Sequence, residues 1–401
     1  MRPFTSTISL EEARARLADA VHPIERIEKI DLADAAGRVA AHDVRAAIDV
    51  PGFARASMDG YAVVSADTAG ASADSPVQLK RVERIYTGRV PERRLKAGEC
   101  AEIATGAPIP DGADAVVMVE QTTANGRDIS VLAAAGAGQN IVPRGADIAA
   151  GAVVLSCGDV LTAARLGSVA AIGAASVHVY GRPRVALLST GDEVVPPGKP
   201  LEPGQIFDVN RFTLGAIVSA HGGVPHPLAG ARDTIEDLDA ALNRALGADI
   251  IIFSGGSSVG ERDHLVDLLN ARGKIIFHGI AVKPGKPTMF GKVGERPFFG
   301  MPGNPTSCLS NAHILLIPFL RATARLPPYS PHRVRAPLAK RIASPAGRHQ
   351  FYTVRLVDGA AVPAFKGSGE ITSLSRADGY IEIPPDQSVV DEGQEVLVTL
   401  F

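Results

Sequence analysis

Apolar residues follow a different spacing in each segment of the chain. Near the start they recur at helical intervals: Leu10, Ala13, Leu17 and Val21. Ser9 precedes this run and Glu12 follows Ser9 by three positions, the capping-box pattern that begins many helices. The pattern predicts one amphipathic helix.

Between 47 and 147 the apolar residues form short runs separated by Gly, Pro and Asp, at 61–64, 77–82 and 115–119. Short runs bounded by turn residues are typical of strands. We therefore predict a β-rich insertion domain over 47–147. It would lie within a discontinuous domain made of 1–46 and 148–181, with the Ala- and Gly-rich stretch around 133–151 as the returning linker.

From 182 to 326 buried strands alternate with amphipathic helices. Runs at 184–189 and 250–253 predict strands, and 212–221 predicts a helix. A second helix has Thr234 and Asp237 as its capping pair and Gly247 as its stop. This alternation predicts an α/β domain over 182–326, with a parallel-rich sheet covered on both faces. Ligands of such sheets bind beyond the carboxyl ends of the strands.

After Pro327 and Pro328 the pattern is again β, with strands expected at 351–357, 381–383 and 395–400. We expect a C-terminal β-barrel or sandwich domain over 327–401. The fold class is thus multidomain α/β plus β.

Composition excludes several classes of function. The chain has 401 residues, 41 basic and 43 acidic, and a net charge of −2, which argues against a nucleic-acid or membrane surface built on net charge. Cys100, Cys157 and Cys308 lie far apart, so the sequence contains no disulfide framework or zinc motif. The apolar runs are much shorter than the ~20 residues of a membrane span, and the N-terminus resembles no signal peptide. We expect a soluble, cytoplasmic protein.

The segment SGGSSVGERD at 254–263 leaves a buried strand and enters a helical run at 265–272. Its glycines allow backbone N–H groups to converge, and its serines add donors, as in phosphate-binding loops. The alternative is a tight turn without a ligand, because glycine-rich turns alone are weak signals.

The segment KPGKP at 283–287 places Lys283 and Lys286 on one proline-stiffened turn. Adjacent ammonium groups repel each other unless an anion lies between them, which favours an oxyanion site. A solvated basic turn is the alternative.

Other turns have both structural and functional interpretations. Asn304, in the turn MPGNP before an apolar helix at 306–320, is expected to cap that helix or to contact a ligand. The turn TGDE at 190–193 could hold a hard cation through its carboxylates, or Asp192 could cap a helix. Asp59 and Thr105 lie in turns of the β-rich segment, where their side chains would satisfy backbone groups.

Taken together, these motifs and their order resemble the MoeA and gephyrin E-domain family of molybdopterin molybdenumtransferases. The resemblance extends over essentially the whole chain and rests on SMDGYA at 57–62, TGAPIPDGADAVV at 105–117, STGDE at 189–193, SGGSSVGERD at 254–263, KPGKP at 283–287 and PGNP at 302–305. It implies an L-shaped homodimer in which the discontinuous domain is elongated. It also implies a reaction that converts adenylylated molybdopterin and molybdate into molybdenum cofactor and AMP, aided by Mg²⁺.

The resemblance also implies roles for individual residues. Molybdate would be held by Lys283, Lys286, Pro287, Arg348 and Ser373. Glu193, Ser258 and Asp263 would line the pterin-phosphate pocket, with Glu193 and Asp263 as metal ligands. Further catalytic positions would be Asp59, Thr105, Asp147 and Asp233, with Asp59 acting across the dimer. A molybdopterin adenylyltransferase is a possible partner.

The chain departs from the family pattern at Ser257, where valine or threonine is frequent, and at His264, where tyrosine is more frequent. Three alternative interpretations compete with this one. A scaffold protein could use the same fold, as gephyrin does. A stand-alone adenylyltransferase would lack the β-rich insertion and tail. Tungstate could replace molybdate, because the two oxyanions are alike in size and charge.

Overall fold

The computed structural model describes residues 7–255 and 264–401 and divides into two compact units. One comprises the chain up to Glu28 and from Tyr180 to Phe401, and the other comprises Lys29–Val179. No helix within the described ranges is long and apolar enough to cross a membrane.

The unit Lys29–Val179 is built on a six-stranded sheet in the order β7-β4-β6-β5-β9-β8. Its strands are β4 (Gly60–Val63), β5 (Val77–Ile85), β6 (Glu99–Ile103), β7 (Ala115–Met118), β8 (Thr122–Asn125) and β9 (Asp128–Val131). Two apolar clusters pack on this sheet, one around Tyr61 and Ile129 and one around Ala62 and Ile103. The strands expected at 61–64, 77–82 and 115–119 are confirmed with small shifts of their ends.

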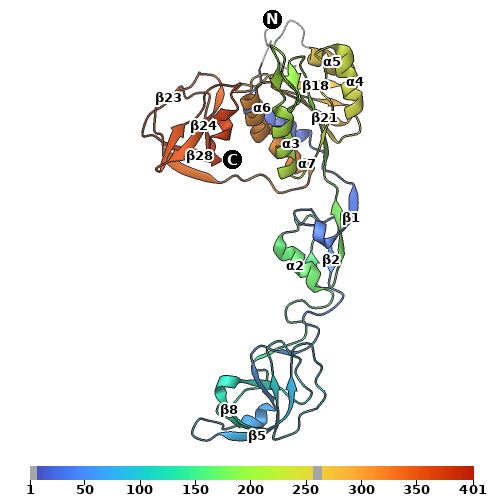
Figure 1. Ribbon diagram of the computed structural model, residues 1–401, viewed down its shortest axis with the longest axis vertical. Helices are drawn as coiled ribbons and strands as arrows, with labels where there is room; N and C mark the ends of the chain where they lie inside the picture. Colours follow the sequence, from blue (N-terminus) through green and yellow to red (C-terminus); the bar gives the residue numbers. More distant parts are fainter. Residues whose placement is uncertain (1–6, 256–263) are drawn as a thin grey trace. The chain divides into compact units, whose positions relative to one another are not determined.

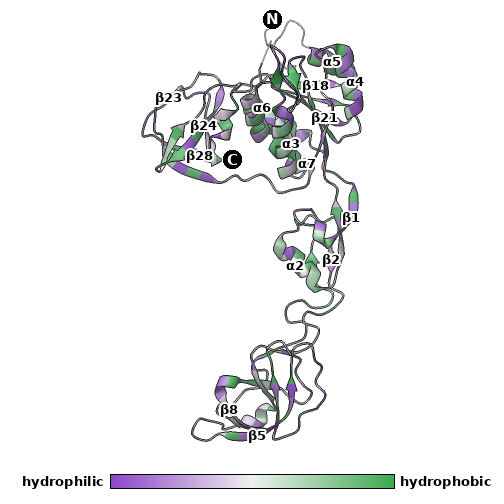
Figure 2. Cartoon of the chain, viewed as in Figure 1, coloured by the Kyte–Doolittle hydropathy of each residue, from purple (hydrophilic) through white to green (hydrophobic). Residues whose placement is uncertain are grey.

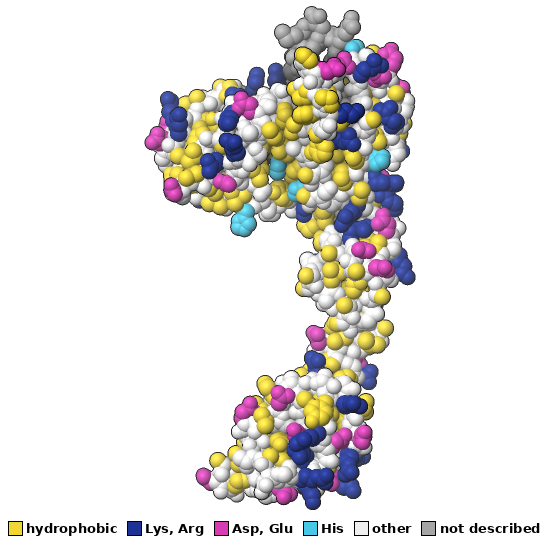
Figure 3. Space-filling model, in the orientation of Figure 1, with side chains coloured by type: hydrophobic (Ala, Val, Ile, Leu, Met, Phe, Trp, Pro, Cys, Tyr) yellow, Lys and Arg dark blue, Asp and Glu magenta, His cyan; other side chains and the backbone are white. Residues whose placement is uncertain are grey.

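Smaller elements complete this unit. They are the pairs β3 (Arg55–Ala56) with β10 (Ile141–Val142) and β2 (Val44–Arg45) with β11 (Val153–Leu155), the helix α2 (Ala163–Ala171), and short helical turns at Leu32–Asp34, Ser65–Thr68 and Val119–Gln121. Strand β1 (Ile27–Asp31) pairs with β12 (Ser176–Tyr180). Figure 3 shows the densest group of basic side chains on this unit. Two of the basic residues on β5, Arg81 and Arg84, are paired with Glu102.

The other unit contains a six-stranded sheet in the order β16-β13-β17-β21-β20-β18. Its strands are β13 (Arg184–Ser189), β16 (Val224–Pro227), β17 (Ile250–Ser254), β18 (Lys274–His278), β20 (Met289–Val293) and β21 (Arg296–Met301). The first four strands in this order pair in parallel. Strand β20 pairs antiparallel with both of its neighbours, β21 and β18. The predicted parallel-rich sheet is therefore confirmed.

Helices cover both faces of this sheet (Figure 1). On β13, Val185 and Leu187 join one apolar cluster while Ala186 and Leu188 join the other, because successive side chains of a strand point to opposite faces. The first cluster includes residues of α1 (Leu10–Asp19), α3 (Asn210–Ala220), α6 (Pro305–Asn311) and α7 (Ile317–Thr323). The second includes residues of α4 (Ile235–Ala245) and α5 (His264–Arg272). In Figure 2, α4 and α5 each carry hydrophobic and hydrophilic residues, as expected for helices with one buried face.

The first helix has the predicted cap, because the Ser9 hydroxyl accepts a hydrogen bond from the backbone N–H of Glu12 at 3.1 Å. Its location differs from the expectation. We grouped it with 148–181, yet Leu10 and Leu17 are buried in the core of the α/β sheet. Helical spacing shows that a helix has an apolar face but does not show which core that face joins.

The helix expected at 306–320 is also modified. A π-helical segment, Ala312–Leu316, separates α6 from α7. Pro318 follows this segment and lacks the N–H that a regular helix requires, so the break in the hydrogen-bond pattern has an identifiable cause.

The C-terminal region forms a curved sheet in the order β19-β24-β26-β28-β22, with β25 paired to β24. The strands are β19 (Val282–Lys283), β22 (Arg333–Pro337), β24 (His349–Val357), β25 (Ala360–Pro363), β26 (Gly379–Ile383) and β28 (Glu395–Leu400). The two edges of this sheet, β22 and β25, are joined among the described residues by a single bridge between Leu338 and Ala361 and not by a ladder of pairs. The region is therefore a half-barrel where we expected a barrel or sandwich. Short elements are β14 (Val194–Val195), β15 (Ile206–Phe207), β23 (Ile342–Ala343), β27 (Val389–Val390) and α8 (Thr372–Ser375).

Candidate functional site

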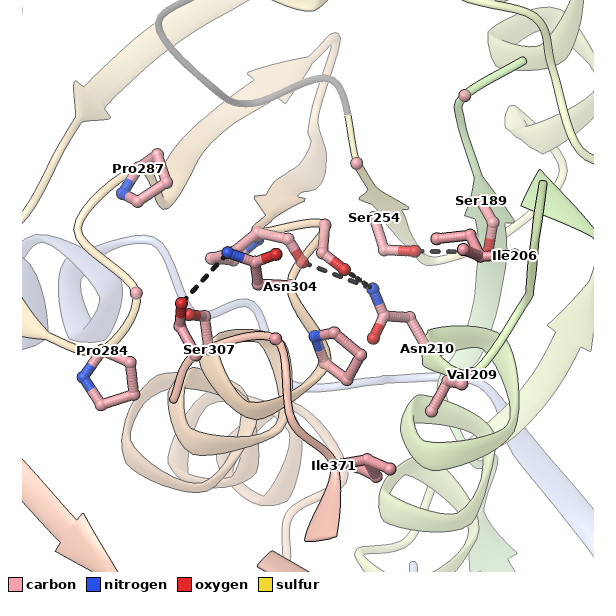
Figure 4. A pocket seen from close by; sticks show the side chains of 18 of the residues that line it. Ser189, Ile206, Val209, Asn210, Ser254, Pro284, Pro287, Asn304, Ser307 and Ile371 are labelled. Carbon is pink, nitrogen blue, oxygen red and sulfur yellow. Dashed lines mark hydrogen bonds between the residues drawn. The ribbon is translucent and has the colours of Figure 1, made fainter. Parts of the chain in front are cut away.

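A cavity of about 1060 Å³ lies at the carboxyl ends of the parallel strands. The turns after β13, β17 and β21 form one side of it, as expected for a sheet of this type. The other side is formed by the KPGKP turn, Arg348 and the segment 365–371 of the C-terminal region. Figure 4 shows Ser189 and Ile206 on one side and Pro284 and Pro287 on the other.

Three cationic side chains line the second side of the cavity: Lys283, Lys286 and Arg348. Pro287 lines it as well. These side chains meet because the short strand β19 pairs in parallel with β24. Lys283 pairs with Gln350, which lies two positions beyond Arg348. Four of the five residues expected to hold molybdate are therefore brought together here.

The fifth, Ser373, does not line the cavity. Its side chain is 0% exposed, and its hydroxyl accepts a hydrogen bond from the backbone N–H of Lys366 at 3.0 Å. It also donates to the carbonyl of Gly367 at 3.4 Å. Ser373 is thus not exposed to the cavity in this structure, and its contact with molybdate stays a prediction. Ser373 instead shapes the segment in which Gly367, Ser368 and Gly369 line the cavity.

Carboxylates line the opposite side, near the end of β13. Asp192, Glu193 and Asp233 all face the cavity, whereas Asp192 caps no helix because β14 follows it. Burial raises the pKa of Asp233, the nearby His264 lowers it, and the negative charges of Asp192 and Glu193 raise it further. Among the described residues, Oδ1 of Asp233 has no hydrogen-bond partner. This concentration of negative charge favours a bound cation.

No three His, Cys, Asp or Glu side chains of the described residues lie close enough together to enclose a metal ion. Mg²⁺ usually takes only one or two carboxylates and completes its shell with water and phosphate oxygens. The Glu193 side of the cavity fits a cation of that kind. Ser258 and Asp263 lie outside the described residues.

The PGNP turn connects the two sides of the cavity. Asn304 occupies the N-cap position of α6, but its side chain does not cap the helix. Its amide donates to the hydroxyl of Ser368 at 3.2 Å, and the Ser368 carbonyl accepts from the N–H of Thr306 at 3.0 Å. The expected side-chain cap is therefore wrong, and Asn304 instead joins the α/β region to the C-terminal region.

Sequence reasoning missed Asp208 and Asn210, which precede and begin α3. Asp208 accepts hydrogen bonds from the Ser189 hydroxyl at 2.8 Å and from the N–H of Arg211 at 3.1 Å. Asn210 donates to the carbonyl of Gly303 at 2.8 Å. Both residues line the cavity. An Asp three residues before a helical N–H is a capping signal, and this signal could have moved the predicted helix start from 212 to 210.

Asp59, Thr105 and Asp147 belong to the unit Lys29–Val179. Oδ1 of Asp59 accepts hydrogen bonds from the backbone N–H of Thr105 at 2.6 Å and from its hydroxyl at 3.0 Å. These two bonds lower the pKa of Asp59. Asp147 is exposed, and its N–H donates to the carbonyl of Val50 at 3.0 Å. The structure thus joins Asp59 to Thr105 and confirms that Asp59 satisfies a backbone donor.

Family models match nearly the whole chain. The "MoeA N-terminal region (domain I and II)" matches residues 8–173, the "Probable molybdopterin binding domain" matches 186–322, and the "MoeA C-terminal region (domain IV)" matches 335–401. The chain belongs to the MoeA family. The cavity therefore lies where the molybdopterin-binding region and the C-terminal region of a MoeA protein meet.

Relatives cover the same span. Molybdopterin molybdenumtransferase 2 of Mycobacterium tuberculosis is 38% identical over 92% of this chain and 94% of its own length. The molybdopterin molybdenumtransferase of Nostoc is 32% identical over 99% and 95%. A crystal structure of the molybdopterin biosynthesis MoeA protein of Pyrococcus horikoshii has a TM-score of 0.84 and 31% identity, covering 99% of this chain and all of that one.

Proposed function

We propose that this MoeA protein inserts molybdenum from molybdate into adenylylated molybdopterin and releases AMP. The observation that carries the proposal is one cavity with Lys283, Lys286 and Arg348 on one side and Glu193 and Asp233 on the other. Relatives named molybdopterin molybdenumtransferase support this assignment.

The cationic side fits molybdate, a dianion. Ammonium and guanidinium groups give it charge-assisted hydrogen bonds, which are shorter and stronger than neutral ones. Lys283 and Lys286 supply compact charges on one turn, whereas Arg348 supplies a planar fork of donors. The positive charges of these three side chains can thus offset the negative charge of molybdate when it lies beside a second anionic substrate.

The carboxylate side fits the adenylylated phosphate together with a cation. Glu193 and Asp263 would hold Mg²⁺, which would offset the charge on the phosphoanhydride and on the departing AMP. Asp233 adds negative charge beside Glu193 and so strengthens the preference of this side for a cation. The oxygen of a water molecule would add to the pterin phosphorus while the bond from that phosphorus to the bridging oxygen breaks. AMP would leave with the bridging oxygen and its electron pair, and the proton of the water would pass to solvent.

The other unit supplies the remaining proposed residues. Asp59 would act at the site of a second copy in a homodimer, and Thr105 and Asp147 would be further catalytic positions. We place the protein in the cytoplasm, with a molybdopterin adenylyltransferase as a possible partner that supplies the substrate, and with no nucleic-acid or membrane partner.

Reconstitution tests this proposal. The purified protein is mixed with adenylylated molybdopterin, molybdate and Mg²⁺, and AMP is measured with time. We expect AMP release that depends on molybdate, stops on chelation of Mg²⁺, and is strongly reduced in Glu193→Gln and Asp263→Asn. A well-folded protein that binds substrate but releases no AMP would instead support a scaffold role.

A further inference from the structure

One buried side chain holds the tip of the KPGKP turn. Asn311, on α6, is 0% exposed. Its amide nitrogen donates to the carbonyl of Gly285 at 2.7 Å and also contacts the hydroxyl of Thr288. That hydroxyl donates to the same Gly285 carbonyl at 3.0 Å. The carbonyl at the tip of the turn thus has two buried donors.

The rest of the turn is held by backbone bonds. The carbonyl of Lys286 accepts from the N–H of Ile280, and the carbonyl of Thr288 accepts from the N–H of Gly279, both at 2.9 Å. Lys283 is fixed by its place in β19. At the tip, between the two lysines, the Gly285 carbonyl is instead held by the side chains of Asn311 and Thr288.

The tip packs directly on the Asn311 amide. Gly285 has a φ of +101°, and a Cβ at this position would lie 2.3 Å from Nδ2 of Asn311. A side chain is excluded both by the backbone conformation and by this close approach. The packing leaves the turn little freedom while Asn311 is present.

Lys283 and Lys286 carry like charges on one short turn, so a turn that loosened would allow their ammonium groups to move apart. Without Asn311 the buried Gly285 carbonyl would lose one of its two donors, which is unfavourable and would allow the tip to move toward water. Either movement changes the spacing of the two ammonium groups relative to Arg348. We infer that Asn311 is a positioning residue that sets the lysine spacing for the oxyanion. This inference rests on the proposed function.

The test compares Asn311→Leu, which keeps a side chain of similar size, with Thr288→Val, which removes only the hydroxyl. Thr323→Val is the matched control, because Thr323 is also buried and its hydroxyl bonds only to its own helix, at the carbonyl of Phe319. We measure AMP release against molybdate concentration, and molybdate binding by calorimetry.

Asn311→Leu should raise the half-saturating molybdate concentration roughly ten-fold, because losing a buried hydrogen bond costs about 1.4 kcal/mol, which corresponds to that factor if the cost appears in molybdate binding. The rate at saturating molybdate and the affinity for adenylylated molybdopterin should stay near wild type. Thr288→Val should change the molybdate requirement in the same direction by less, and Thr323→Val should not change it.

The two readouts separate this inference from the proposed function. If the wild type binds molybdate but releases no AMP, the proposed function fails. The role of Asn311 is then still tested by comparing molybdate binding of the wild type and the variants by calorimetry. If the wild type does not bind molybdate, or if Asn311→Leu and Thr288→Val bind it as the wild type does, the inference is overturned. Should Asn311→Leu fail to fold, Thr288→Val alone decides.

Discussion

Lys283 pairs with Gln350 across two parallel strands, one from the α/β region and one from the C-terminal half-barrel. This pairing brings the KPGKP turn to Arg348 at the same cavity. The cationic side of the site is therefore built by two regions that are distant in sequence.

Alanine at Lys283 or Lys286 should raise the molybdate concentration needed for AMP release by roughly ten-fold or more, because each lysine gives a charge-assisted contact. Excess molybdate should restore much of the rate. Lys274→Ala, at an exposed lysine on β18 that does not line the cavity, is the control. A loss of pterin affinity that matches the loss of molybdate affinity would show that these lysines hold the pterin phosphate instead.

Asp233 should make folding stability depend on pH. Its pKa in the folded protein is raised above 3.8, chiefly by burial, so the folded state favours the protonated form. Stability should fall as pH rises through the raised pKa, and Asp233→Asn, which stays neutral, should not share this fall. Urea unfolding of both proteins between the ordinary aspartate pKa and neutral pH measures the difference. If the free energies of unfolding of the two proteins changed equally with pH, the raised pKa of Asp233 would be contradicted.

Ser373→Ala should lower the free energy of unfolding by about 1 kcal/mol, because it removes a buried acceptor from the N–H of Lys366. Ser375→Ala, at an exposed position of the same short helix, should have little effect. Denaturant titrations provide the comparison. If Ser373→Ala raised the molybdate requirement with no loss of stability, Ser373 would be a direct ligand after all.

Thr105→Ala should raise the pKa of Asp59, since it removes the hydroxyl bond but leaves the stronger backbone bond. The lowered pKa of Asp59 gives stability that is present above the ordinary aspartate pKa and is lost as pH falls through the folded value. NMR titration of the Asp59 carboxyl carbon can follow the change. An unchanged pKa would mean that the backbone bond alone sets it.

The proposed homodimer predicts complementation between inactive variants. Asp59→Asn and Glu193→Gln should each be inactive alone. If Asp59 acts across the dimer, a mixed dimer of the two variants would contain one site with both native residues. Mixing should then recover up to about a quarter to a half of the wild-type activity. Light scattering first establishes the oligomeric state. An active monomer, or dimers that exchange subunits without recovery, would exclude this arrangement.

Local patterns sufficed for much of the secondary structure. The strand Arg184–Ser189 and the Thr234 cap of α4 were predictable because a strand's alternation and a helix's first turn depend on residues close in sequence. The position of the site also followed from the sequence, since turns after parallel strands share one edge of the sheet.

The sequence by itself thus determined the elements, the α/β alternation and the residue types of the site. The tertiary structure decided which side chains share a cavity: it brought Arg348 to Lys283, buried Ser373 behind the segment that it shapes, and turned Asn304 toward Ser368. It also placed the first helix in the α/β core and Asn311 beneath Gly285. The physical reason is that these contacts join segments far apart in the chain, and they depend on packing between elements, which local spacing does not specify.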